Sequence, residues 1–288
     1  MLLQILIEGL LMGGIYAIAA LGLSLIFGVM KITNFAHGAL MTVGMYAVYV
    51  LFTYFGLSPY AALPLAAILL FGIGYFIQRF FIHKIENAPT HNQLLLTLGI
   101  SIIIENLLLA IFKPDAKSEV FEAFSRSASF GGISVNIPKF IAIFVVIAVT
   151  TAVYIFLYKT EVGRTVRATS MDREGALLMG IVIKKTKALS FGIGAMCAGI
   201  AGALLTPTLN IDPAIGSTFQ LTCFVIAVLG GMGNIWGALI SGFIVGILES
   251  VTSYYLSGSY SSLAIYGVFI LVLLFKPTGL FERRARRD

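Results

Sequence analysis

Long apolar runs are the feature that most limits what this chain can fold into. Eight segments each hold about twenty mostly apolar residues, the length that an α-helix needs to cross a bilayer. Of the 288 residues, 59% are hydrophobic and 11% are charged, whereas soluble domains carry about 25% charged residues. We therefore predict an all-α polytopic membrane protein that forms one unit over residues 1–288. The predicted full spans are 5–29, 38–56, 60–82, 93–112, 138–158, 188–206, 236–256 and 261–276.

A further apolar run, residues 218–229, is too short for a full helical crossing. It is followed by the glycine-rich sequence GGMGN at 230–234. Irregular backbone is tolerated at membrane depth only where it lies against protein or a water-filled cavity. We therefore predict a short or broken span near 218–234. Its turn supplies four candidate residues for a translocation pathway, namely Gly230, Gly231, Gly233 and Asn234.

Basic residues are concentrated in the loops on one side of the predicted spans. With the N-terminus outside and nine crossings, 15 of the 19 Lys and Arg residues fall on the cytoplasmic side, as the positive-inside rule requires. The segment 159–187 is then cytoplasmic, and the longest external loop is 113–137. We expect that external loop to be either an interfacial helix that seals the bundle rim or a docking surface for a partner. The opening MLLQILIEGL is expected to be a retained helix rather than a signal peptide.

Composition argues against several other classes of protein. The net charge of +6 follows from the basic loops, and the chain lacks the charged surface that binding of nucleic acid requires. Cys197 and Cys223 lie in apolar runs without disulfide or metal-ligand spacing, and the three histidines do not cluster. The sequence contains no G-x-x-x-x-G-K-[ST] phosphate loop. We expect no catalytic residue, no metal and no cofactor bound by this chain; if ATP drives its function, another chain must bind the ATP.

The most informative inner stretch is EVGRTVRATSMDREGALLMGI, residues 161–181. Its Glu174, Gly175 and Ala176, followed after three residues by Gly180, resemble the E-A-A-x-x-x-G loop of ABC-importer permeases, with glycine replacing the first alanine. In those families the loop forms a short cytoplasmic helix that docks into a groove on the ATPase. An ordinary basic inner loop is the alternative interpretation. The coupling residues that the resemblance implies are Arg164, Arg167, Ala168, Asp172, Arg173, Glu174, Gly175, Ala176 and Gly180.

Three more motifs lie in order along the chain. KITNFAHGALMTVGMYA from Lys31 is similar to the N-F-A-H-G-x-[LM]-x-x-x-G-x-Y signature of the branched-chain amino acid permease family. GGMGNIWGALISGFIVG from Gly230 and KPTGLF from Lys276 resemble that family's glycine block and its C-terminal ending. The resemblance is strongest to its LivH-type permeases. It implies a homologous second permease subunit, two ATP-binding cassette ATPase subunits and an extracytoplasmic substrate-binding protein.

Polar residues within or beside the spans are further pathway candidates. Ionisable groups at membrane depth are costly and usually face the bundle interior, so Glu105 and Glu249 either line a pathway or pair with a neighbouring helix. Asn34 and His37 flank a predicted break between the first two spans, where His37 also suits a packing role. The candidate pathway set therefore adds Asn34, His37, Thr97, Gly99, Ser101 and Glu105 to the glycine turn.

Together these features predict a permease subunit of an ABC importer in the bacterial inner membrane. It would move branched-chain or related small hydrophobic amino acids into the cytoplasm by alternating access. Two alternatives stay open: a permease of the same family for urea or short amides, and a self-sufficient secondary transporter or channel. The second alternative requires ion-coupling residues within the spans, and few intramembrane charges are present.

Overall fold

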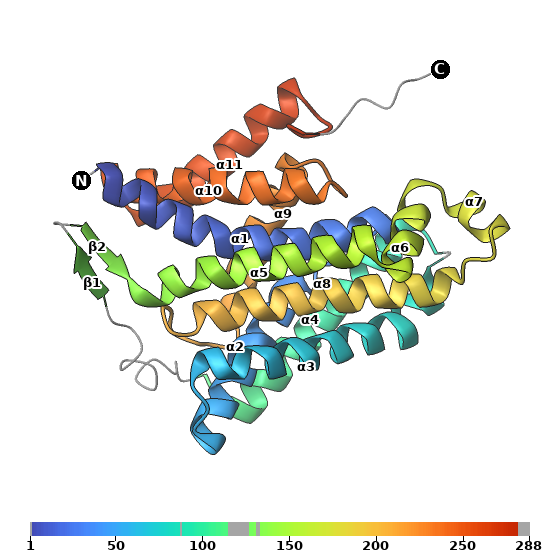
Figure 1. Cartoon of the computed structure of the whole chain (residues 1–288), viewed down its shortest axis with the longest axis horizontal. Helices are drawn as coiled ribbons and strands as arrows, with labels where there is room; N and C mark the ends of the chain where they lie inside the picture. The colour runs from blue at the N-terminus through green and yellow to red at the C-terminus, as the bar shows by residue number, and fades with distance from the viewer. Residues whose placement is uncertain (1, 87, 115–126, 131–132, 282–288) are drawn as a thin grey trace.

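The computed structural model describes residues 2–86, 88–114, 127–130 and 133–281 (Figure 1). Helices make up nearly all of this part of the chain. In order, the elements are α1 (Leu2–Met30), α2 (His37–Phe55), α3 (Pro59–Phe80), the 3-10 helix η1 (Ile82–Ile85), α4 (Thr90–Phe112), β1 (Ser127–Phe130), β2 (Ile133–Asn136), α5 (Ile137–Lys159), α6 (Glu161–Met171), α7 (Arg173–Leu178), α8 (Ile183–Leu205), α9 (Ile215–Leu229), α10 (Ile235–Tyr255) and α11 (Gly258–Phe275).

Seven of the described helices are long and apolar enough to cross a membrane: α1, α2, α3 with η1, α4, α5, α8 and α10. This confirms the predicted all-α polytopic class. The sequence predicted eight full spans, and the eighth, 261–276, corresponds to α11. The apolar part of α11 that the structure describes, Tyr260–Phe275, is shorter than those seven helices.

The two central helices of the bundle are α1 and α8, whose most apolar windows are 83% and 89% buried. Small residues bring their backbones together. A Cβ on Gly22 would lie only 2.5 Å from the carbonyl oxygen of Gly194. Glycines of α1 and α10 pack in the same way, as Gly13 does against Gly242 and Gly246. These small-residue faces therefore serve helix packing within the subunit.

The segment predicted to be the external loop contains a β-hairpin. β1 and β2 pair antiparallel, with Ser127 opposite Asn136 and Phe130 opposite Ile133. The alternative of an interfacial helix for 113–137 is therefore wrong over 127–130 and 133–136, while residues 115–126 and 131–132 lie outside the described part. The sequence of this segment, SASFGGISVN, has two short runs around a Gly-Gly pair, which is a recognised hairpin signal.

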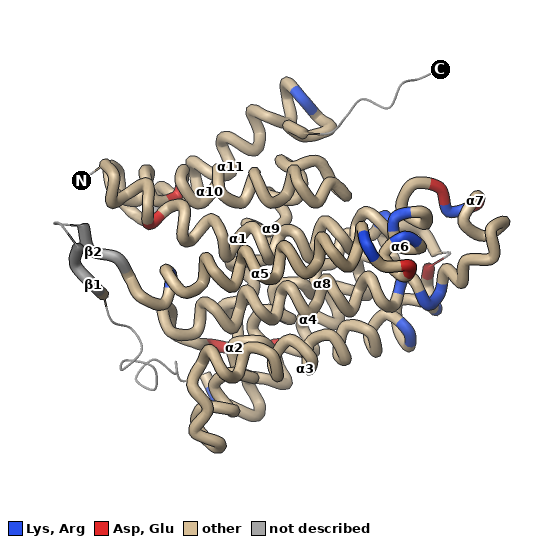
Figure 2. Tube along the Cα trace, in the orientation of Figure 1, with Lys and Arg blue, Asp and Glu red and all other residues tan. Residues whose placement is uncertain are grey.

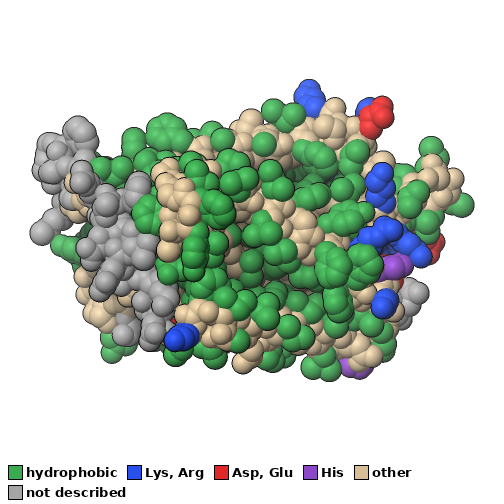
Figure 3. Space-filling view, turned by 90° about the horizontal axis from the view of Figure 1, so that it is seen from below, with side chains coloured by type: hydrophobic (Ala, Val, Ile, Leu, Met, Phe, Trp, Pro, Cys, Tyr) green, Lys and Arg blue, Asp and Glu red, His purple; other side chains and the backbone are tan. Residues whose placement is uncertain are grey.

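The two ends of the bundle differ in charge. Basic residues gather at the end that carries α6, α7 and the start of α8, which we call the basic end (Figure 2). The N-terminus and the hairpin lie at the opposite end, which we call the hairpin end (Figure 1). On the face seen in Figure 3, the surface between the two ends is mostly hydrophobic. This distribution is typical of a protein whose middle faces lipid and whose ends face water.

Candidate functional site

The connection from α5 to α6 holds the basic end in a defined orientation. Thr160 caps α6 by accepting a hydrogen bond from the Gly163 backbone N–H at 3.0 Å. The Arg167 Nε donates to the carbonyl of Leu157 at 2.9 Å, and its guanidinium lies 4.4 Å from the centre of the Tyr158 ring. Arg167 therefore anchors α6 to α5, rather than standing free for a partner.

The short helix α7 is well capped at both ends. The Asp172 carboxylate accepts hydrogen bonds from the backbone N–H groups of Glu174 and Gly175, both at 3.0 Å. A Cβ on Gly175 would lie 2.5 Å from Asp172 Oδ2. Glycine in place of the first alanine of the E-A-A pattern therefore leaves space for this cap.

Gly180 ends α7 in the left-handed region, with φ of 78°. Its N–H donates to the carbonyl of Leu177, and the N–H of Ile181 donates to that of Ala176, both at 3.0 Å. These two bonds form a Schellman motif, which favours glycine at this position. The left-handed conformation of Gly180 and its two bonds therefore end α7.

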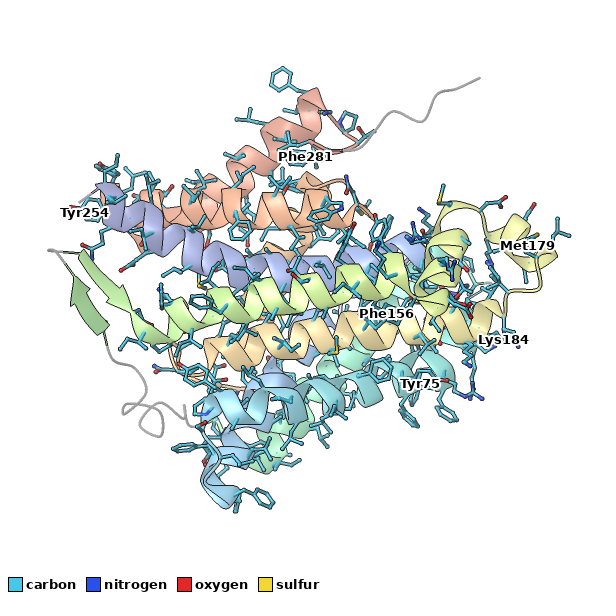
Figure 4. The ribbon with its side chains drawn as sticks, viewed as in Figure 1. Tyr75, Phe156, Met179, Lys184, Tyr254 and Phe281 are labelled. Atoms are coloured by element: carbon cyan, nitrogen blue, oxygen red, sulfur yellow. The ribbon has the colours of Figure 1, made fainter. Side chains whose placement is uncertain are left out.

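An apolar tip projects from the basic end. The side chains of Leu178 and Met179 are 89% and 83% exposed, and Figure 4 shows Met179 at the outermost part of this projection. Ala176, in contrast, is buried. Exposed apolar groups gathered next to charged residues mark surfaces that contact other proteins. The residues of this apolar tip are Met171, Leu177, Leu178, Met179 and Val182.

One acidic residue that sequence reasoning missed fixes the orientation of α7. Glu86 follows η1, and one of its carboxylate oxygens lies 3.0 Å from Lys187 Nζ and 3.2 Å from His83 Nδ1. Its other oxygen lies 3.6 Å from Arg173 Nη2. Burial alone raises the pKa of Glu86, but its hydrogen bonds and charge pairing with Lys187 and His83 outweigh burial and hold that pKa below its usual value.

The other predicted coupling residues lie on the surface of the same segment. Arg164 forms an exposed i,i+3 pair with Glu161 at 3.6 Å, a contact that contributes little to stability. Ala168 is half-buried, and Glu174 is exposed. The structure thus brings the predicted coupling residues together in α6 and α7, and only some of them face outward.

A second candidate site lies at the break between α1 and α2. His37 Nε2 donates to the carbonyl of Ala19 at 2.8 Å, which assigns the ring proton to Nε2. Because Ala19 lies eleven residues before the end of α1, α2 begins about 16 Å back along that helix. Asn34 and His37 are both fully buried there. The predicted break therefore lies deep within the bundle.

Gln220 of α9 completes this polar cluster. Its side chain accepts from the Gly38 N–H at 2.7 Å and donates to the Asn34 carbonyl at 3.2 Å. Thr97 of α4 also contacts this cluster, because its hydroxyl accepts a hydrogen bond from the Phe35 N–H at 3.2 Å. Sequence reasoning missed Gln220, a polar residue inside the short apolar run.

Two nitrogens of the cluster, Asn34 Nδ2 and His37 Nδ1, are buried without a hydrogen-bond partner among the described residues. Buried donors and acceptors of this kind are costly unless a partner is supplied in another state. Among the described residues, the remaining α4 candidates make no side-chain hydrogen bond to the cluster, and each is half-buried rather than buried. These are Gly99, Ser101 and Glu105.

The glycine turn is present between α9 and α10, as predicted. Gly231 and Gly233 have φ of 87° and 93°, backbone conformations that other residues rarely adopt. The Gly233 N–H donates to Ser24 Oγ of α1 at 3.1 Å. The Asn234 side chain caps α10 through the Gly237 N–H at 3.1 Å. Gly230 packs against the first turn of α10, where a Cβ would meet the backbone of Ala238.

The C-terminal motif closes this turn. The Leu280 N–H donates to the Leu229 carbonyl at 2.7 Å, and Asn234 Nδ2 donates to the Phe281 carbonyl at 2.9 Å. Figure 4 shows Phe281 beside the α9–α10 region. Two motifs separated by some fifty residues in the sequence therefore form one structure.

These features define a class. Membrane-length helices pack around the shorter helix α9 and buried backbone breaks, and a projection with charged and exposed apolar residues stands at one end. This is the architecture of a multi-pass membrane permease. Residues 5–273 match the family described as "Branched-chain amino acid transport system / permease component". The chain belongs to that family.

Known proteins give the same assignment. The chain is 32% identical to the high-affinity branched-chain amino acid transport system permease protein LivH of Escherichia coli K12, over 98% of this chain and 96% of the relative. It is 24% identical to LivM, a permease protein of the same description in that organism, over 92% of this chain and 67% of the relative. The solved structure of PsaBC from Streptococcus pneumoniae in complex with Fab has a similar fold, with a TM-score of 0.54, 13% identity, and coverage of 94% of this chain and 91% of that chain.

Proposed function

We propose that this chain is the translocation subunit of an ATP-driven importer that carries branched-chain amino acids across the bacterial inner membrane. Membership of the permease family over residues 5–273 supports the substrate class. The structural observation that carries the proposal is the apolar tip on a capped, ion-paired α7. A small apolar helix held rigidly at one end of a membrane bundle suits docking into a groove of an ATPase.

Contacts at the basic end connect α7 to the central helices, so a displacement of α7 can be transmitted to the centre of the bundle. Arg167 fixes α6 to α5, while Glu86 connects Arg173 of α7 to Lys187 of the central helix α8. Rigid elements joined by buried contacts transmit displacement better than flexible loops do. ATP-driven closure of two ATPase subunits would therefore move α8 and switch the pathway between its two openings.

The proposal assigns the remaining tasks to partners. Two ATP-binding cassette subunits bind and hydrolyse ATP, and an extracytoplasmic binding protein supplies substrate affinity. Similarity to both LivH and LivM supports pairing with a second, homologous permease. The alternatives of a urea or amide permease and of a self-sufficient transporter are not favoured, because the relatives' descriptions concern branched-chain amino acid transport systems.

The test is reconstitution of the complete complex in liposomes, with leucine uptake and ATP hydrolysis measured together. We expect Leu178→Glu to lower both at least tenfold, because it places a charge on the docking tip. Leu178→Met is the matched control, since it keeps the tip apolar and should leave both near normal. Leucine uptake by the permease without any ATPase, or normal coupling in Leu178→Glu, would contradict the proposal.

A further inference from the structure

A cavity of about 490 Å³ opens at the hairpin end, between the beginning of α1, the beginning of α5 and the last turns of α10. Its volume lies within the range of roughly 300–1,000 Å³ that is usual for small-molecule sites. In Figure 4, Tyr254, which lines it, lies at the opposite end of the bundle from Met179 and Lys184. The lining residues are Gln4, Ile5, Glu8, Met12, Lys139, Gly246, Glu249, Ser250, Ser253 and Tyr254.

The wall between α1 and α10 is rigid. The Ser250 hydroxyl donates to the Ile5 carbonyl at 2.8 Å. One turn further along, Gly9 and Gly246 bring the two backbones so close that no side chain fits between them. Side chains at this end of the two helices are thus held in fixed positions around the cavity.

The charges that line the cavity are unusual for a chain with so few charged residues. Two carboxylates, Glu8 and Glu249, and one ammonium, Lys139, face the same space. Glu249 is hydrogen-bonded by Tyr16, yet its Oε2 is enclosed and has no hydrogen-bond partner among the described residues. A buried carboxylate oxygen without a partner is costly unless a ligand supplies a donor.

We propose that this cavity is an external binding site for a zwitterionic α-amino acid on its way into the pathway. Glu249 and Glu8 would bind the α-ammonium group, and Lys139 would bind the α-carboxylate. Ile5 and Met12 supply apolar surface for an aliphatic side chain. The choice of amino acid rests on the proposed function, but the complementarity to a zwitterion rests on these residues alone.

The test uses a thiol placed in the cavity. Ser253 lines the cavity and is exposed, and the native thiols Cys197 and Cys223 are fully buried. Ser253→Cys in the assembled complex should react with an impermeant maleimide from the hairpin end. Millimolar leucine should slow this reaction at least fivefold. Ser257→Cys, exposed at the same end but outside the cavity, is the matched control and should be unaffected by leucine.

Leucine analogues that lack one charged group show which groups of the ligand the cavity binds. We expect no protection by 4-methylpentanoate, which lacks the ammonium group, or by isopentylamine, which lacks the carboxylate. In the Ser253→Cys background, Glu249→Gln and Lys139→Met should each weaken protection by leucine at least tenfold. Glu161→Gln, which changes an exposed carboxylate at the basic end outside the cavity, should not. A cavity thiol that does not react, or protection that survives Glu249→Gln, would overturn the proposal.

A phosphatidylethanolamine headgroup shares the ammonium-plus-anion chemistry of an amino acid, so the lipid must be varied. Nanodiscs of phosphatidylcholine should leave the thiol reactive until leucine is added. Blocked labelling without leucine in phosphatidylethanolamine nanodiscs alone would assign the cavity to lipid instead. Leucine uptake by the wild-type complex separates the proposed cavity site from the proposed importer function. If leucine is transported but does not protect Ser253→Cys, the cavity site is wrong and the importer function is retained.

Discussion

The Arg173 guanidinium lies 3.6 Å from the Glu86 carboxylate, and this contact joins the exposed helix α7 to the turn between α3 and α4. Glu86 also pairs with Lys187, whose side chain is only 4% exposed. Removing one member of a buried pair leaves the other charge without compensation, which is more damaging than loss of a surface pair. Glu86 therefore acts as a positioning residue for the predicted coupling segment.

We expect Glu86→Gln to lower ATP-driven uptake more than it lowers ATP hydrolysis, because α7 would still dock but would no longer move α8 with it. The ratio of leucine transported to ATP hydrolysed should fall severalfold in liposomes. Glu161→Gln is the control, since in the described part of the chain that carboxylate pairs only with the exposed Arg164. Equal ratios for the two variants would show that Glu86 has no part in coupling.

The same carboxylate should give a pH-dependent contribution to stability. Because its pKa in the folded protein lies below the ordinary value near 4.5, its stabilising effect is complete above about pH 4.5 and is lost as the pH falls through the lower folded-state value. Thermal unfolding of the purified permease should therefore separate wild type from Glu86→Gln at pH 6 and bring them together towards pH 3. A difference in thermal stability between wild type and Glu86→Gln that widens on acidification would contradict the predicted direction of the pH dependence.

The α1–α10 crossing gives a prediction about folding. A Cβ at Gly246 would meet the backbone of Gly13, whereas a Cβ at Gly267 of α11 would meet nothing within 4 Å. Gly246→Val should destabilise the bundle by about 1–3 kcal/mol through overpacking and lower the yield of folded protein in detergent. Gly267→Val should have no such effect, and a size-exclusion profile combined with thermal unfolding distinguishes the two.

How much the sequence predicts depends on whether the signal is local. The span lengths, the break at GGMGN and the end of α7 at Gly180 each follow from residues within one short segment. The contacts of Glu86 and Gln220 do not, since Lys187 lies 101 residues from Glu86 and Gly38 lies 182 residues from Gln220. The contact of Thr97 with Phe35, 62 residues away, is likewise long-range, whereas Gly99 and Glu105 are only half-buried.

Gly180 gives the sharpest test of the predicted coupling segment, because two physical effects can be separated there. Its φ of 78° disfavours any residue with a side chain, at a cost of about 1–3 kcal/mol. The space around it is nevertheless open within this subunit, since a Cβ would meet nothing within 4 Å. Within the subunit, damage from a side chain at this position therefore comes from the backbone, and bulk matters only against a docked partner.

Asn tolerates the left-handed region better than other side chains, so Gly180→Asn should keep the α7 C-cap and much of the transport. Gly180→Arg combines backbone strain with bulk and charge beside the apolar tip, and we expect it to abolish leucine uptake and stimulated ATP hydrolysis while the permease still inserts. Co-purification of the ATPase subunits is the direct measurement. Normal uptake in Gly180→Arg, or complete retention of the ATPase subunits on it, would show that this segment is not where the partner binds.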